Sequence, residues 1–479
     1  GGDLLDTNVN DETTAPSSIS LTNQILCGYQ GWFNFPGDGS PLDRWKHWFA
    51  VPGNNSTAKE LTVEMFPITT EYDEEDLKES EILLHNDHGG DRNESEGGGT
   101  RKYAKFFSSA RPKVVLKHFE WMKMYGITGA FHSRFMQGLH MPKDRESKTM
   151  VLRNVMNAAE ATGRSFAVSY DISGQKITNG ILDDLKADWM RLVDEEGITQ
   201  STRYIRQNGL PVLNVYGIGF VNRKIDDTDK MAGLIDWFQH TAPERYRVFF
   251  LGGVPGRWRD GKGDSRGGPA WQGIYDSMDG IQAWHVGRWQ TTEGFERYFS
   301  NVISKDATYC ASKGILYMPT MWPGFSWHNL QKEKKDNNNK QQHQQQQVQP
   351  KAPEMNKIPR LGGEFLWKQA HAYASHPNIH TIWMAQFDEV DEGTAIFKVA
   401  ARASDLPAEA SWLSLDADGK VLPEDWYLRL AGEAQLMLAG EREITENIPI
   451  RPDESVGVHH TLLLGDRQGL PFEQVVQMN

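Results

Sequence analysis

The chain has 479 residues, which is enough for one large domain with insertions or for two or three small domains. Hydrophobic residues make up 38% and aromatic residues 11%, so the chain can bury a substantial core. The formal net charge of −13, without a basic stripe, argues against a nucleic-acid surface. No segment of the sequence approaches the roughly 18 consecutive apolar residues of a membrane span.

Four segments are predicted to lie outside the folded core. Residues 1–22 are polar and predict a disordered N-terminal arm, and residues 444–479 form a C-terminal tail without a clear role. The single predicted domain occupies residues 23–443. Within it, the Asn- and Gln-rich residues 330–352 predict a disordered insertion. The acidic and Gly-rich region around residues 71–99 predicts a flexible surface loop.

Eight short apolar runs recur along the chain and predict β-strands. Each run is too short for a helix and is bounded by glycine, proline or polar residues. The runs are ILCGY from Ile25, GAFHSRF from Gly129, FAVSYD from Phe166, PVLNVYG from Pro211, RVFFLGG from Arg247, GIQAWHV from Gly280, ILYMP from Ile315 and TIWMAQF from Thr381. Segments with apolar residues at helical spacing lie between most of them, and a closing helix is predicted after the eighth run.

This alternation favours a (β/α)₈ TIM barrel. From the second run to the seventh, the strands repeat every ~30–45 residues, which is the size of one β-α unit. The alternative is an open doubly wound sheet, which has fewer strands and usually an early Gly-rich phosphate turn. The segment QGWFNFPGDG after the first run lacks that glycine spacing. We therefore expect a single barrel domain with long loop insertions.

Polar and aromatic side chains follow the predicted strands, at positions that meet at one mouth of a barrel. Aromatic faces and carboxylates suit the C–H faces and hydroxyls of a sugar, whereas a phosphate requires arginine, lysine or a backbone nest. We therefore expect a glycan or oligosaccharide as the partner. The candidate substrate-binding residues are Trp32, His47, Asp171, Tyr216, Trp322, Trp327 and His328.

The segment FDEVDEGTAIF follows the eighth predicted strand and contains four carboxylates within five residues. A barrel places this segment at its mouth. Glu389 and Glu392 are three residues apart, so a helical turn brings them within about 5–6 Å of each other. Two carboxylates are the minimum set for acid and base catalysis on an acetal. The alternatives are a helix cap, pairing with arginine, or calcium binding.

Two other functions compete with an acid–base enzyme. In a metal-dependent barrel hydrolase, His47, His132, His285 and His328 would meet acidic residues at the mouth. No H-x-H follows the first strand and no pair among these four histidines has helical spacing, so no metal and no other cofactor is predicted. In a non-catalytic glycan-binding barrel, the aromatic residues would remain, but the chain need not keep two acids.

Several motifs in order resemble the family 71/99-like group of glycoside hydrolases, related to the family 99 endo-α-mannosidases. They are GYQGWFNFPGDG with RWKHW, GITGAFHSRF, VSYDISG, VLNVYGIGF, PGFSWHN and FDEVDEGTAIF, and they span roughly Leu26 to Gly440. The last motif is the most specific, because family 99 carries a similar F-N-E-W-H-E-G-T-x-I stretch. The resemblance implies a (β/α)₈ hydrolase that cleaves an α-linked O-glycosidic bond in a glycan.

The resemblance also implies roles for two residues. The first glutamate of the family motif falls on Glu389, which would assist attack by the 2-hydroxyl of the sugar and give a 1,2-anhydro intermediate with overall retention. The second falls on Glu392, which would protonate the leaving oxygen and later activate water. Asp388 replaces Asn, and Val390-Asp391 replaces Trp-His, so mannose specificity does not carry over. A secreted or lumenal location is favoured, and the oligomeric state stays open.

Overall fold

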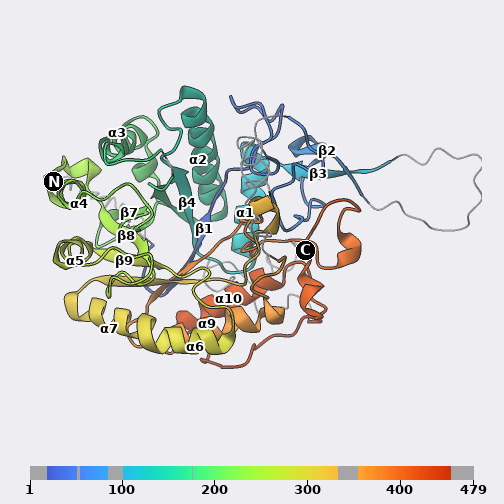
Figure 1. Cartoon of the computed structure of the whole chain (residues 1–479). Helices are drawn as coiled ribbons and strands as arrows, with labels where there is room; N and C mark the ends of the chain where they lie inside the picture. Colours follow the sequence, from blue (N-terminus) through green and yellow to red (C-terminus); the bar gives the residue numbers. More distant parts are fainter. Residues whose placement is uncertain (1–18, 51–53, 85–100, 175, 333–353, 455–479) are drawn as a thin grey trace, which may run out of the picture.

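A computed structural model describes residues 19–50, 54–84, 101–174, 176–332 and 354–454. Eight parallel strands form a closed barrel with helices around it, which confirms the predicted (β/α)₈ fold (Figure 1). Around the barrel the strand order is β5-β4-β1-β11-β10-β9-β8-β7, and pairing of β5 with β7 closes the ring.

All eight predicted strands overlap the strands of the barrel. These are β1 (Gln24–Tyr29), β4 (Gly129–Phe135), β5 (Ser165–Asp171), β7 (Leu210–Tyr216), β8 (Phe249–Pro255), β9 (Gly280–Trp284), β10 (Leu316–Met321) and β11 (Thr381–Met384). A short strand, β6 (Arg206–Gln207), pairs antiparallel with β7. Strand β11 ends before the predicted run does, yet the N–H of Phe387 still donates to the carbonyl of Gly28 over 2.8 Å. The chain beyond β11 therefore stays against β1.

Helices connect successive strands on the outside of the barrel (Figure 1). They are α1 (Pro112–Met124), α2 (Pro142–Thr162), α3 (Ile181–Asp194), α4 (Thr228–Asp236), α5 (Pro269–Asp276), α6 (Thr292–Tyr298), α7 (Ser304–Lys313), α9 (Glu364–Ala374) and α10 (Trp426–Leu438). A wider helical turn, η3 (Trp237–Thr241), extends α4, and another, η5 (Phe299–Ile303), joins α6 to α7.

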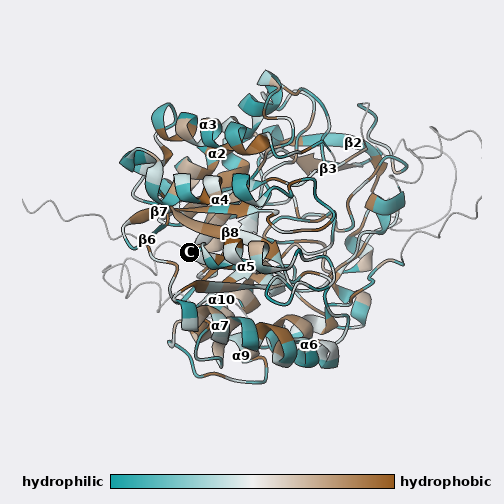
Figure 2. Ribbon diagram, turned by 60° about the vertical axis from the view of Figure 1, so that its left-hand side comes forward, coloured by the Kyte–Doolittle hydropathy of each residue, from teal (hydrophilic) through white to brown (hydrophobic). Residues whose placement is uncertain are grey.

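Helix α1 shows how the sequence sets these elements. Pro112 occupies its first turn, where a missing N–H is tolerated, and Val115, Phe119 and Met122 recur at helical spacing and are buried. The chain leaves the helix at Gly126, whose φ of 72° is left-handed. Figure 2 shows the same division across the molecule, with hydrophobic colour on central strands such as β7 and β8 and hydrophilic residues on the outer helices.

The closing helix returns to the first strand. The side chain of Gln435 on α10 accepts the N–H of Ile25 over 2.6 Å and donates to the carbonyl of Asn23 over 2.9 Å. Both groups of this buried amide are thus paired, as a polar side chain in a core requires. The beginning and the end of the barrel domain are joined by these bonds.

The long insertion after β1 contains an antiparallel hairpin that the sequence patterns did not predict. Strand β2 (Leu77–Leu83) pairs with β3 (Tyr103–Phe107). The indole N–H of Trp48 donates to the carbonyl of Phe107 over 2.8 Å, and the two rings meet edge to face. The RWKHW motif therefore contributes a core beneath this hairpin.

The predicted arm, insertion and tail lie mostly outside the described residues. Leu21, within the described part of the arm, is fully buried, and the side chain of Ser20 bonds Gln207 over 2.7 Å. The carbonyl of Thr445, in the predicted tail, accepts the indole N–H of Trp367 over 3.1 Å. Residues near both ends thus pack on the barrel. Among the described helices, none combines the length and the apolar character needed to cross a membrane.

Candidate active site

A cavity of about 480 Å³ opens at the carboxyl ends of the barrel strands. We call it the central cavity. Residues that follow most of the strands contribute to its wall, as expected for the mouth of such a barrel. The sequence-predicted residues that line it are Trp32, Asp171, Tyr216, Trp327, Glu389 and Glu392.

A tight turn after β11 presents the two glutamates. The N–H groups of Thr394 and Ala395 donate to the carbonyl of Glu389 over 3.2 and 3.0 Å. Gly393 has a φ of 64°, a left-handed value that favours glycine, and its backbone packs closely on Ser326. The N–H of Ser326 donates to the carbonyl of Glu392 over 2.9 Å. The loop after β10 thereby supports the turn that carries both carboxylates.

The four carboxylates of this segment have different surroundings. The side chain of Asp388 accepts the backbone N–H of Gln30 over 2.7 Å and that of Gly31 over 2.9 Å. Asp391 lies 3.9 Å from the ring of His47. Asp388 and Asp391 therefore support the loops around the mouth, while Glu389 and Glu392 line the central cavity.

Burial raises the pKa of Glu389 well above its usual value, and the neighbouring Glu392 and Asp391 raise it further. A hydrogen bond from the Gln30 side chain acts in the opposite direction. Burial also raises the pKa of Asp388 to about 7, although the N–H groups of Gly31 and Gln30 favour its charged form. Neighbouring carboxylates in a buried site repel each other when both are charged, so the charges of Glu392 and Asp391 disfavour ionisation of Glu389.

Several lining residues escaped the sequence prediction. Arg223 and Lys357 come from loops well beyond the ends of β7 and β10, and Gln386 follows β11 directly. The indole N–H of Trp383 donates to the side-chain oxygen of Gln386 over 3.2 Å, which orients this amide in the cavity wall. A prediction that considers only the first residues after each strand cannot find Arg223 or Lys357, because the long loops that carry them fold back over the cavity.

His47 does not line the central cavity, contrary to expectation. Its ring stacks on Trp32, with centroids 3.9 Å apart and planes within 5°. It faces a second cavity of about 380 Å³ on the other side of Trp32. Burial, with Lys46 and Lys148 next, holds the pKa of His47 well below its usual value, so the ring is neutral at physiological pH.

Two further predicted residues lie away from both cavities. The prediction for Trp322 was wrong: its side chain is 0% exposed and packs against Trp289 and Phe365, with centroids 5.4 and 4.8 Å away. Trp322 is the first residue after β10, and its side chain lies in the layer between barrel and helices. His328 lies in the segment whose Ser326 and Asn329 bind the carboxylate of Glu64, and it is not among the residues that line either cavity.

Glu64, a buried acid from the long first insertion, also escaped prediction. It accepts the N–H of Asn329 over 2.6 Å and the hydroxyl of Ser326 over 2.7 Å. Its own N–H donates to the carbonyl of Val390 over 2.9 Å. Glu64 thus holds together the loops after β10 and β11, which carry Trp327 and the two glutamates.

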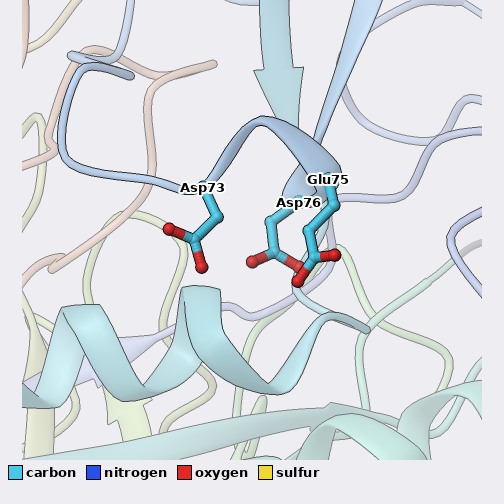
Figure 3. A group of neighbouring side chains, drawn as sticks. All are labelled: Asp73, Glu75 and Asp76. Carbon is cyan, nitrogen blue, oxygen red and sulfur yellow. The ribbon is translucent and has the colours of Figure 1, made fainter.

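The described residues contain one group of acids close enough to share a metal ion, namely Asp73, Glu75 and Asp76 (Figure 3). The ammonium of Lys113 lies 2.7 Å from both Asp73 and Glu75, and Arg111 lies 3.7 Å from Asp76. Each of the three acids thus already has a cationic partner, and the group lies in the hairpin insertion rather than in the central cavity. His132 and His285 are buried, and desolvation lowers the pKa of each to about 3.

Comparison with solved structures agrees with the barrel. The chain aligns with the GH99 endo-alpha-mannosidase from Bacteroides thetaiotaomicron at 13% identity and a TM-score of 0.57, covering 88% of this chain and all (100%) of that one. A structure of that enzyme in complex with bis-tris propane aligns at 12% identity and a TM-score of 0.57, over 89% and 100%. These neighbours are glycoside hydrolases, and at such identities the likeness establishes the fold. No family profile and no curated protein matches the sequence.

Proposed function

We propose that this protein is a glycoside hydrolase that cleaves an O-glycosidic bond in a glycan, with Glu389 and Glu392 as its catalytic pair. The observation that carries this proposal is that the four acids of the loop after β11 have different contacts. Asp388 binds backbone amides and Asp391 faces His47, while the two glutamates line one cavity. Most glycoside hydrolases cleave an acetal with such a pair of carboxyl groups, one as an acid and the other as a base or nucleophile.

The lining of the central cavity supports a sugar as the substrate. The indole N–H groups of Trp32 and Trp327 are buried and have no acceptor within the described parts of the chain. A sugar hydroxyl can accept both bonds, and the aromatic faces can pack on its C–H groups. Asp171 and Arg223 add an acceptor and a donor at the far wall.

We assign the two glutamates different roles. Following the resemblance to family 99, Glu389 in its ionised form takes the proton of the 2-hydroxyl as that oxygen attacks C1, and its raised pKa makes that ionised form a strong base. Glu392, which is less buried, gives its proton to the leaving oxygen as the C1–O bond breaks. Water then opens the 1,2-anhydro ring, losing a proton to Glu392 while Glu389 returns one to O2. The anomeric configuration is retained and an α linkage is expected, both following the resemblance to family 99.

The test is turnover of a panel of α- and β-linked oligosaccharides by the purified full chain, followed by mass spectrometry. Glu389→Gln and Glu392→Gln should each lower turnover by about 10²–10⁴-fold, the usual value of acid–base assistance. Glu354→Gln is the matched control, since this glutamate is exposed and does not line the cavity. Glycan binding without turnover by the wild type would instead indicate a glycan-binding barrel. Loss of turnover on chelation, with recovery on adding metal, would indicate a metal hydrolase.

A further inference from the structure

The second cavity adjoins the central cavity. Both are lined by Gln30, Trp32, Ser133 and Phe135, so these residues form a shared wall. The rings of Trp32 and Phe135 lie 5.1 Å apart within it. A sugar chain that occupies the central cavity therefore has a neighbouring space of about 380 Å³ into which a substituent or a further residue can extend.

Cationic side chains distinguish this second cavity. Arg44, Lys46 and Lys148 line it, against one acidic residue, Asp144. Lys46 lies 4.0 Å from Asp144, at the limit of an ion pair. In the described part of the chain, no carboxylate lies within ion-pairing distance of Arg44 or Lys148, and the ammonium of Lys148 donates to the carbonyl of Gln137 over 2.6 Å. We call this space the cationic cavity; its positive lining contrasts with the net charge of −13 of the whole chain.

Two further features of its wall suit an anion. His132 is only 2% exposed, and neither ring nitrogen has a hydrogen-bond partner of normal geometry among the described residues. Helix α2 begins beside the cavity at Pro142, after Met141, and no side chain caps it. The positive end of the 21-residue helix dipole therefore adds to the charge of the lysines.

We infer that the cationic cavity binds a negatively charged substituent of the glycan, such as a sulfate, phosphate or carboxylate group, while the scissile bond lies at Glu389 and Glu392. The inference rests on the proposed function and specifies its substrate class as an acidic glycan. A neutral sugar does not pair with cationic side chains. Partial burial of a cation costs free energy unless an anion pairs with it. Lys46 and Lys148 would contact the anion directly, with Arg44 at the entrance.

The electrostatics of Lys148 support this inference. Burial first, and then the charge of Lys46, lower the pKa of Lys148 to about 7. Arg134 lowers it further, while Asp144 and Asp188 raise it. A bound anion would favour the charged ammonium, so binding should take up a proton near neutral pH.

The test measures binding of oligosaccharides to the full chain by titration calorimetry. The probes are sulfated galactan, phosphorylated mannan and polyuronide oligosaccharides, each compared with a neutral oligosaccharide of equal length. At least one acidic probe should bind more tightly than its neutral counterpart, and added NaCl should reduce that preference. The three acidic probes distinguish sulfate, phosphate and carboxylate as the source of the charge.

Variants locate the effect. Lys46→Met and Lys148→Met should each weaken binding of the preferred acidic probe by roughly ten- to a hundredfold, the value of a hydrogen bond to a charged group. Lys148→Arg should retain most of the affinity. Lys143→Met is the matched control, because Lys143 is exposed on the same helix and does not line the cavity. Binding of the neutral probes should be unchanged throughout.

Two results would overturn the inference. One is that no acidic probe binds the wild type more tightly than its neutral counterpart, and the other is that Lys143→Met weakens binding as much as the cavity variants do. The proposed function fails separately, through absence of turnover of any glycan by the wild type. A preference for acidic probes without turnover would support the anion-binding site and contradict the proposed hydrolase function.

Discussion

The carboxylate of Asp388 accepts the backbone N–H of Gly31 over 2.9 Å, and this bond ties the loop after the last strand to the loop after the first. The same carboxylate accepts the N–H of Gln30 over 2.7 Å. Glu389, the next residue, and Gln30 both line the central cavity. Asp388 is therefore a positioning residue, which holds two sides of the cavity together through the backbone.

Asp388→Asn should lower the free energy of unfolding by about 1–3 kcal/mol. An amide offers one acceptor oxygen where the carboxylate offers two, so one buried backbone N–H loses its partner. Asp184→Asn is the control, because Asp184 is exposed, and it should change stability by less than about 0.5 kcal/mol. Urea unfolding of the three proteins measures the difference. Equal midpoints for all three would show that the bonds of Asp388 contribute nothing.

The same variant should change how stability depends on pH. The pKa of Asp388 is raised to about 7 in the folded protein, above the ~3.9 of an unfolded aspartate. Between these pH values the folded state holds the proton more tightly than the unfolded state. The contribution of Asp388 to the free energy of unfolding is therefore greatest below pH ~4 and is lost as pH rises toward 7. The slope of unfolding free energy against pH between 5 and 7 should be less negative in Asp388→Asn than in the wild type. An identical slope would contradict the raised pKa.

Gly28 should tolerate no side chain. A Cβ added at this position in β1 would lie 1.6 Å from the side-chain oxygen of Gln386 in the cavity wall. Gly28→Ala should therefore displace Gln386 and lower either turnover or folded yield, whereas Gly233→Ala on α4 meets nothing within 4 Å and should be neutral or stabilising. Melting temperature and turnover measured on both variants decide the point. A fully active, equally stable Gly28→Ala would mean that Gln386 is free to move.

The sequence was a good guide to the barrel because strand burial gives a local signal. The run at residues 166–171 is mostly apolar and ends at Asp171, and its residues before Asp171 are buried on both faces, as in a strand covered by helices. The hairpin β2–β3 gave no such signal. In β2, Lys78, Glu79 and Glu81 are exposed and only Ser80 and Ile82 are buried, so the segment shows no clear run of apolar residues. Its place in the fold comes from packing with distant aromatic residues.

Asp171 and Tyr216 end β5 and β7, and both line the central cavity, as expected for residues at the carboxyl ends of barrel strands, while their role in substrate binding stays a prediction. The prediction failed for Trp322, because one residue of register decides whether a side chain faces the mouth or the helices. The cationic cavity could not be foreseen either. Its cationic residues come from the loop after β1 and from α2, and the pairing of β1 with β4 brings these segments together.

The contrast between Trp322 and Trp327 is directly testable. Trp322→Ala should lower the free energy of unfolding by about 3–5 kcal/mol, since it removes a fully buried ring. Trp327→Ala should leave stability nearly unchanged and raise KM about tenfold or more, because burial of an aromatic ring against a ligand contributes on the order of 1.5–3 kcal/mol. Urea unfolding and steady-state kinetics separate these effects. A raised KM in a stable Trp322→Ala protein would indicate that Trp322 does bind substrate.

The roles of the two glutamates differ in how they respond to the leaving group. Protonation by Glu392 matters less when the leaving group departs readily as an anion, so Glu392→Gln should abolish cleavage of natural glycans yet retain cleavage of a dinitrophenyl or fluoride glycoside. Attack by the 2-hydroxyl precedes departure with any leaving group, so Glu389→Gln should lower both activities by about 10²–10⁴-fold. A 2-deoxy-2-fluoro substrate, which lacks the hydroxyl, should be inert to the wild type and should form no covalent adduct detectable by mass spectrometry.

The control for this experiment must preserve the loop. Asp388→Asn is unsuitable on its own, because Asp388 holds the backbone of Gln30 and Gly31. Glu354→Gln removes a charge from an exposed residue that does not line the central cavity, and it should leave both activities intact. If Glu389→Gln spared the activated substrates and Glu392→Gln did not, the two roles would be exchanged. A trapped glycosyl–Glu389 adduct would replace participation of the 2-hydroxyl with direct attack by the carboxylate on C1.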